Sequence, residues 1–250
     1  MQRIFHTPEG VRDIYSQECS RKQKLQEKLH RVFHQYGFED IETPTFEYFE
    51  VFSKEVGTIP SRELYKFFDR EGNTLVLRPD FTPSVSRACA TYFNPEKEVV
   101  SLCYTGNTFI NNSSFRGRLK ETTQMGVERM GDDSPEADAE ILAMTVECLL
   151  ATGLTEFQVS VGQVDYYKAI FAQTGMSQEE EEELRELISQ KNYFGVEELV
   201  KNKNMDKSLA RVLSQLPQMF GSTEVLEKAK SLTDNPQALK AVARLEEIYE

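Results

Sequence analysis

The sequence has no long apolar run, no apolar leader and fewer positive than negative charges. No stretch of about 18 apolar residues occurs among its 250 residues, so no transmembrane helix is expected. The opening residues MQRIFHTPEG lack the apolar segment of a secretory signal. Its 29 Lys and Arg against 41 Asp and Glu give a net charge of −12, which argues against a protein that mainly grips a nucleic-acid backbone. We therefore expect a cytoplasmic protein with no membrane partner.

Cysteine and histidine are too few and too scattered to predict a metal centre or a disulfide framework. The cysteines are Cys19, Cys89, Cys103 and Cys148. They show no C-x-x-C spacing, so we expect free thiols in a reducing cytosol. Of three histidines, His30 and His34 stand four residues apart on a predicted helix, a spacing that could ligate a metal ion. Because we expect no acidic or cysteine side chain beside them, we predict no bound metal and no cofactor.

Amphipathic helices and short β-prone stretches alternate over residues 1–165. Apolar residues recur on one helical face over residues 17–36, with Ser16 as the predicted N-cap and Gly37 as the stop. A second helix is predicted from Thr82 as N-cap and Pro83 as first helical residue. A third is predicted from Ser134–Pro135 to Gly153. These helices require a sheet to pack against.

The β-prone stretches supply that sheet. Residues 66–81 read as a hairpin around the turn REGN, and residues 98–131 read as a longer hairpin around the polar loop NNSSFRG. A further strand is predicted over residues 155–167. Residues 37–52 read as an extended stretch in which Pro44 indicates an edge or interface position. The alternation indicates the α+β class, an antiparallel sheet with helices packed on it.

The composition changes near residue 170. No strand signal follows, and Gly and Pro separate several short helical stretches. The acidic run Glu179–Glu183 suits the first turn of a helix, where negative charge is favourable. We predict a sheet-containing domain over residues 1–168 and a small helical domain over residues 169–250.

Four segments resemble, in order and spacing, the catalytic core of histidyl-tRNA synthetase and its paralogues. They are TPEGVRDI, GFEDIETPTFE, LVLRPDFTPSVSR and YTGNTF…GRLKETTQMGVERMG. The resemblance covers roughly residues 5–165 and implies the class II aminoacyl-tRNA synthetase fold, an antiparallel sheet flanked by helices with a small helical insertion domain. It also implies a homodimer formed through GFEDIETPTFE, the segment that resembles motif 1 of that class.

The resemblance assigns a histidine-binding role to Asp80, Thr82, Gln124 and Glu128. In the family the matching residues hold the α-ammonium group of histidine. The residue types suit that task, because an ammonium group needs carboxylates and an amide oxygen, and charged hydrogen bonds are the stronger kind. Gln124 and Glu128 share one face of a strand, since side chains alternate. The alternative is a set of ordinary outward-facing polar residues on an antiparallel sheet.

The residues that the family uses to adenylate histidine are missing. Ile110 stands where the resemblance places an arginine for the ATP α-phosphate, followed by Asn112 and Ser113 in place of a glutamate and a basic residue. Charge that develops during adenylation needs a preorganised cation, so aminoacylation is predicted to be lost. Arg118 matches a Gly-Arg position of the family and is either a ligand or phosphate contact or a solvated hairpin charge.

The sequence keeps the residues of the amino-acid pocket and lacks the adenylating arginine. In this combination it resembles the regulatory subunits of short-form ATP phosphoribosyltransferase. That resemblance implies no enzyme activity and no tRNA, but a hetero-oligomer with a catalytic subunit, which the chain activates. It further implies feedback by L-histidine on the first step of histidine biosynthesis. Two alternatives stay open: a histidyl-tRNA synthetase or a fragment of one, and a stand-alone histidine-sensing or interaction module. The family's later glycine-rich motifs do not occur before Glu250, so we expect a fragment or a shortened relative.

Overall fold

The computed structural model describes residues 6–53, 59–112, 117–203 and 205–249. The chain divides into two compact units, which are described separately. The core unit consists of the residues up to Asp133 together with Glu140–Phe157. The helical unit consists of Ser134–Ala139 and the residues from Gln158 onward. The predicted domain boundary after residue 168 falls inside helix α5 (Val164–Phe171).

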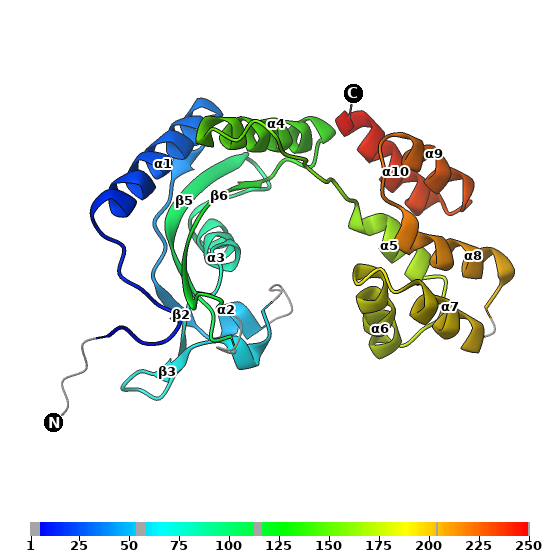
Figure 1. Ribbon diagram of the computed structural model, residues 1–250, viewed down its shortest axis with the longest axis horizontal. Coiled ribbons are helices and arrows are strands. Elements are labelled where there is room, and N and C mark those ends of the chain that lie inside the picture. Colours follow the sequence, from blue (N-terminus) through cyan, green and yellow to red (C-terminus); the bar gives the residue numbers. More distant parts are fainter. Residues whose placement is uncertain (1–5, 54–58, 113–116, 204, 250) are drawn as a thin grey trace. The chain divides into compact units, whose positions relative to one another are not determined.

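A three-stranded sheet forms the centre of the core unit (Figure 1). Its order is β1-β5-β6, with bounds Glu39–Asp40, Val100–Phe109 and Glu121–Met130. Strands β5 and β6 form the predicted long hairpin, in which Leu102 pairs with Glu128 and Gly106 pairs with Gln124. Strand β1 runs parallel to β5. The long hairpin is therefore confirmed, and the parallel pair adds to the expected antiparallel arrangement.

A second, smaller sheet has the order β2-β4-β3 and is antiparallel throughout. Its strands are Phe46–Tyr48, Thr74–Leu77 and Lys66–Phe68. Strands β3 and β4 are the two arms of the hairpin predicted around REGN, which is confirmed. Two short helical segments accompany this sheet, α2 (Glu50–Ser53) and the 3-10 turn η1 (Ser61–Glu63). With helices packed on sheets, the α+β class is confirmed.

Helices cover both faces of the β1-β5-β6 sheet (Figure 1). On one face, α1 (Ser16–Gln35) and residues 140–152 of α4 (Pro135–Thr152) pack around buried Phe33, Cys103 and Met144. On the other face, α3 (Thr82–Tyr92) packs on buried Leu102 and Tyr104. Side chains alternate along a strand, so consecutive residues of β5 pack against helices on opposite faces of the sheet. We call these the α1 face and the α3 face.

Both predicted N-caps are wrong by one residue. Helix α1 starts at Ser16, whose φ is 51°, and its N-cap is Tyr15. Helix α3 starts at Thr82, with Phe81 as N-cap. The Thr82 hydroxyl, which sequence reasoning assigned to capping the helix, donates instead to Glu128 on β6. The predicted stop at Gly37 is confirmed by its φ of +78°, which suits glycine after a helix.

The strand predicted over residues 155–167 is wrong. Its last part forms the first turn of α5, and the described chain has no strand between Thr152 and Val164. Phe157, Val159 and Val161 alternate as in a strand, yet all three are exposed. Alternation predicts a strand only if a neighbouring backbone pairs with it, and this part of the described chain pairs with none.

The helical unit contains α5 and five further helices, and no strand among its described residues. The helices are α6 (Gln178–Ser189), α7 (Tyr193–Asn202), α8 (Lys207–Gln215), α9 (Glu224–Ser231) and α10 (Pro236–Tyr249), with the 3-10 turn η3 (Leu216–Gln218). They enclose a core of fully buried apolar side chains that includes Ile170, Leu184 and Leu213. The predicted series of short helices is confirmed.

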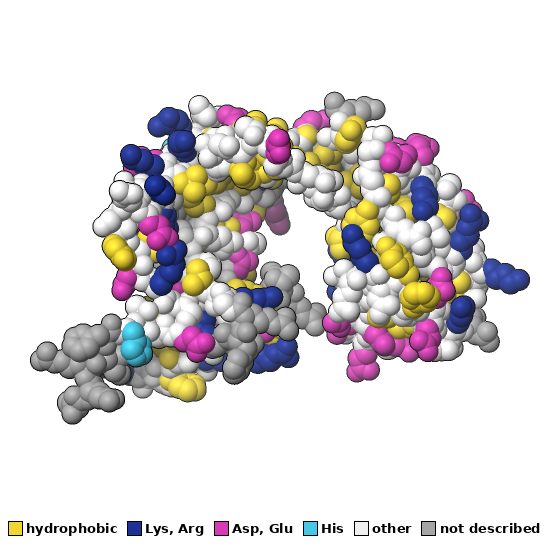
Figure 2. All heavy atoms as spheres, viewed as in Figure 1, with side chains coloured by type: hydrophobic (Ala, Val, Ile, Leu, Met, Phe, Trp, Pro, Cys, Tyr) yellow, Lys and Arg dark blue, Asp and Glu magenta, His cyan; other side chains and the backbone are white. Residues whose placement is uncertain are grey.

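The acidic run Glu179–Glu183 lies in the first turns of α6, as predicted. Ser177 caps this helix, and its hydroxyl and the Glu180 carboxylate each accept a backbone N–H in a capping box. Figure 2 shows acidic side chains gathered over this end of the unit. In the described part of the chain, no helix combines the length and apolar character needed to cross a membrane.

Candidate amino-acid site on the hairpin

The four predicted site residues form two hydrogen-bonded pairs on the α3 face. The Thr82 hydroxyl donates to Glu128 Oε1 at 2.6 Å, and Gln124 Nε2 donates to Asp80 Oδ1 at 3.0 Å. The backbone N–H of Phe81 also donates to Asp80 Oδ1, at 2.7 Å. One member of each pair lies at the start of α3, Asp80 just before the helix and Thr82 as its first residue, and the other lies on β6. The structure therefore brings together residues that are 44 and 46 positions apart.

Tyr104 completes the group, and sequence reasoning missed it. Its hydroxyl donates to Glu128 Oε1 at 3.4 Å, and only 4% of the residue is exposed. Its ring stacks on Phe81 with the ring centres 4.3 Å apart. The ring has room because it crosses Gly126 on β6, where an added Cβ would collide with the tyrosine hydroxyl. A glycine inside a strand is a signal of such a close approach.

Burial and a neighbouring negative charge both disfavour the ionised form of Glu128. Burial raises the pKa of its carboxyl, and the neighbouring Asp80 carboxylate raises it further, while hydrogen bonds from Thr82 and Tyr104 act against both. Burial likewise raises the pKa of the Tyr104 hydroxyl above its ordinary value. Two carboxylates held near each other are stabilised by a cation between them. The arrangement therefore suits a cationic amine.

Arg78 holds the segment that carries Asp80 and Thr82. Its guanidinium is almost fully buried and donates to the carbonyl oxygens of Thr43, at 2.8 Å, and Asn107, at 2.9 Å. It also lies over the Phe81 ring, 4.0 Å from the ring centre. These bonds tie the segment to β5 and to the stretch before β2. The Arg78 guanidinium therefore holds the site segment in position through bonds to backbone carbonyls.

An alkyl side chain, that of Ile110, stands at the end of β5, at the position to which the sequence resemblance assigned the ATP-binding arginine. Ile110 follows β5 directly, is half-buried, and donates its backbone N–H to the Lys120 carbonyl at 2.9 Å. Asn112 is half-buried and Arg118 is exposed. Ser113 lies outside the described residues. The functional roles of Ile110 and Arg118 stay predictions.

The expectation that no acidic or cysteine side chain lies beside His30 and His34 is wrong. Asp40 and Cys103 lie with them on the α1 face of the sheet. Asp40 belongs to a strand of two residues, too short for a pattern to reveal, and Cys103 is 63 positions further along the chain. Only the pairing of β1 with β5 brings these two side chains to the histidines.

Comparison with known proteins identifies relatives of this chain. The sequence profile described as histidyl-tRNA synthetase matches residues 10–250. The ATP phosphoribosyltransferase regulatory subunit of Acetivibrio thermocellus is 40% identical over 244 residues, which cover 98% of this chain and 58% of that protein. The protein of the same name from Ruminiclostridium cellulolyticum is 39% identical, with the same coverage.

Solved structures show the same architecture. The crystal structure of an ATP phosphoribosyltransferase regulatory subunit/histidyl-tRNA synthetase from Bacillus halodurans C is 30% identical with a TM-score of 0.88, covering 100% of this chain and 65% of that one. The histidyl-tRNA synthetase of Nostoc sp. is 19% identical with a TM-score of 0.76, covering 99% of this chain and 57% of that one, a likeness of fold alone.

The chain spans less than two thirds of the length of these curated relatives. The family profile matches this chain from residue 10 to residue 250. The solved structures confirm the expected class II synthetase-like fold. This chain belongs to the histidyl-tRNA synthetase family.

Proposed function

We propose that this chain is a non-catalytic regulatory subunit of short-form ATP phosphoribosyltransferase. In this proposal it activates a separate catalytic subunit, and L-histidine bound on the α3 face carries feedback inhibition. The observation that carries the proposal is the pairing of Thr82 with Glu128 and of Gln124 with Asp80, together with the neutral Ile110 directly after β5. Acceptors for an ammonium group are kept, while the position for the phosphate-binding cation holds an alkyl chain. The names of the two relatives support this reading.

The proposed binding mode uses the two carboxylates as acceptors. The α-ammonium group of histidine donates to Glu128 and Asp80, and each charged hydrogen bond contributes about 1.5–3 kcal/mol. Gln124 and Thr82 hold these carboxylates in place. The ligand charge offsets the cost of burying Glu128 beside Asp80. Arg118, which is exposed on the second arm of the hairpin, is a further candidate contact for a ligand or phosphate.

We also propose a cytoplasmic homodimer. The supporting surface is on β2, where Phe46 and Tyr48 are 52% and 54% exposed while Glu47 between them is buried. Phe46 belongs to the segment that resembles motif 1 and Tyr48 follows it directly, and exposed aromatic residues suit an interface. Light scattering at micromolar concentration should give the mass of two chains, and the mass of one chain would contradict the dimer. All four cysteines are free thiols, in keeping with a reducing compartment.

The test of the regulatory role is reconstitution. This chain should capture a catalytic subunit of short-form ATP phosphoribosyltransferase in a pull-down and raise its transferase activity. Added L-histidine should then lower that activity, whereas the catalytic subunit alone should not respond. Capture without any effect of histidine would reject the feedback part, and failure to capture would reject the regulatory role.

ATP–pyrophosphate exchange separates the alternatives. Because Ile110 offers no charge to the ATP α-phosphate, this chain should show no histidine-dependent exchange. Exchange clearly above that of a chain-free blank would favour a histidyl-tRNA synthetase or a fragment of one. Histidine binding with neither exchange nor capture of the catalytic subunit would favour a stand-alone sensing module.

A further inference from the structure

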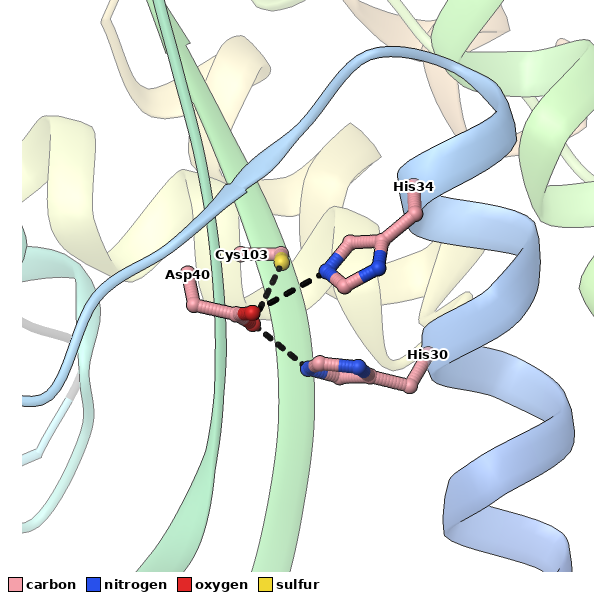
Figure 3. A group of neighbouring side chains, drawn as sticks. All are labelled: His30, His34, Asp40 and Cys103. Atoms are coloured by element: carbon pink, nitrogen blue, oxygen red, sulfur yellow. Dashed lines mark hydrogen bonds and ion pairs between the residues drawn. The ribbon is translucent and has the colours of Figure 1, made fainter.

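Four side chains with metal-binding chemistry meet on the α1 face of the sheet (Figure 3). His30 and His34 are one helical turn apart on α1, so both imidazoles point the same way. Asp40 on β1 and Cys103 on β5 are direct register partners of two parallel strands. Register partners share a face of the sheet, and this face is the one that α1 covers. Three elements therefore deliver four ligand groups to one place.

The other three groups surround the Asp40 carboxylate. His30 Nε2 lies 2.6 Å from Oδ1, His34 Nε2 lies 3.1 Å from Oδ2, and Cys103 Sγ donates to Oδ1 at 3.4 Å. The potential ligand atoms all lie within 4.8 Å of one another. In a tetrahedral zinc site, bonds of about 2.0–2.3 Å place ligand atoms about 3.3–3.8 Å apart. Small side-chain movements would be enough to bring these atoms to the spacing of a zinc site.

Burial and access also suit a bound ion. Cys103 is completely buried in an apolar cluster, so packed side chains close the site on the side of β5. The imidazoles are partly exposed, at 34% for His30 and 47% for His34. The Asp40 side chain is also exposed, at 58%, so solvent reaches the cluster from this side. One side of the cluster is therefore apolar and closed, and the other is open to an incoming ion.

We propose that His30, His34, Asp40 and Cys103 bind one zinc ion. The ligands are the two Nε2 atoms, one Asp40 oxygen and the Cys103 sulfur, and the thiol proton leaves to solvent as the metal–sulfur bond forms. Two imidazoles and a thiolate favour zinc and similar borderline ions, whereas magnesium and calcium take oxygen ligands. The site lies on the opposite face of β5 from Tyr104, and it is independent of the proposed regulatory function.

The test is metal binding by the whole chain without an affinity tag. Chelator-treated protein is titrated with zinc against a chromophoric chelator, and with cobalt followed by absorption. We expect one equivalent of zinc, unaffected by excess magnesium, and a cobalt–thiolate charge-transfer band. Replacing His30 or His34 with Gln should weaken zinc binding by more than the roughly 10–100-fold that loss of an outer-sphere partner costs. Cys103→Ser should abolish the charge-transfer band.

Matched variants keep the test specific. His6 is exposed and lies outside the cluster, so His6→Gln should leave zinc affinity unchanged, and Cys148→Ser should keep the cobalt–thiolate band. Because His34 is exposed, His34→Gln should fold even if Cys103→Ser disturbs the core, and circular dichroism checks this. No stoichiometric zinc, or zinc retained with wild-type affinity by both His30→Gln and His34→Gln, would overturn the site. A cobalt complex without a thiolate band would overturn the role of Cys103.

Discussion

At the scale of the residue, the ionised Glu128 side chain destabilises the ligand-free fold. Burial and the nearby Asp80 carboxylate both disfavour its charged form. Glu47 shows the contrast: it is also buried, but its carboxylate pairs with the Arg87 guanidinium at 2.8 Å. A carboxylate kept half-buried next to a second carboxylate is typical of a site that awaits a cation. This difference makes the two glutamates a matched pair for mutation.

Glu128→Gln should stabilise the ligand-free chain and weaken histidine binding. Because the folded-state pKa of Glu128 is raised above its ordinary 4.5, wild-type stability falls as pH rises through that raised value, and the variant lacks this fall. The variant's advantage in unfolding free energy should therefore grow from below pH 4.5 to neutrality, measured by urea denaturation. Calorimetry should show histidine affinity lower by about 1.5–3 kcal/mol. Glu47→Gln should instead destabilise, and a less stable Glu128→Gln at neutral pH would contradict the site.

At the scale of the element, the β5–β6 hairpin shows what sequence reasoning can and cannot reach. Alternation and the polar loop predicted both arms, and the resemblance placed Gln124 and Glu128 on one face. Tyr104 was missed because its role depends on which residue it faces across the hairpin, Gly126, and on stacking against Phe81. Pairing between distant strands is equally invisible to a local pattern. That is why Asp40, on a two-residue strand, escaped notice.

Gly126→Ala tests the crossing of Tyr104 over β6. An added methyl group would collide with the tyrosine hydroxyl, which stacking and burial hold in place, so we expect a loss of about 1–3 kcal/mol of stability. Displacement of Tyr104 should also weaken histidine binding. Gly162→Ala is the control, because a Cβ there meets nothing within 4 Å. Chemical denaturation compares the two variants, and equal stabilities would refute the crowding.

At the scale of the whole molecule, the two units have separate hydrophobic cores. The core of the helical unit is built entirely from residues between Tyr166 and Val242. The two clusters of the core unit are built from residues between Val32 and Ala151. Each unit can therefore bury its apolar side chains without the other, as independently stable domains do.

Leu213→Ala should destabilise the helical unit and leave the core unit unchanged. Leu213 is fully buried, and such truncations cost about 2–5 kcal/mol. Calorimetry should show two unfolding transitions, of which one moves, and hydrogen exchange should assign that one to residues 166–242. Phe194, which is 85% exposed, provides the control Phe194→Ala, with little expected change. If both transitions shifted together, the units would be one cooperative structure.

The burial of Arg78 affects how a mutational scan of this protein should be interpreted. Its guanidinium donates to Thr43, Pro44 and Asn107 carbonyls and rests on Phe81, beside the residues that hold the ligand in our proposal. In a selection for histidine response, substitutions at Arg78 would score as badly as those at Glu128. Abundance measured in parallel would separate the two positions, because Arg78 variants would disappear from the cell while Glu128→Gln would accumulate. A cation in a ligand-binding motif can thus produce a binding phenotype without ever contacting a ligand.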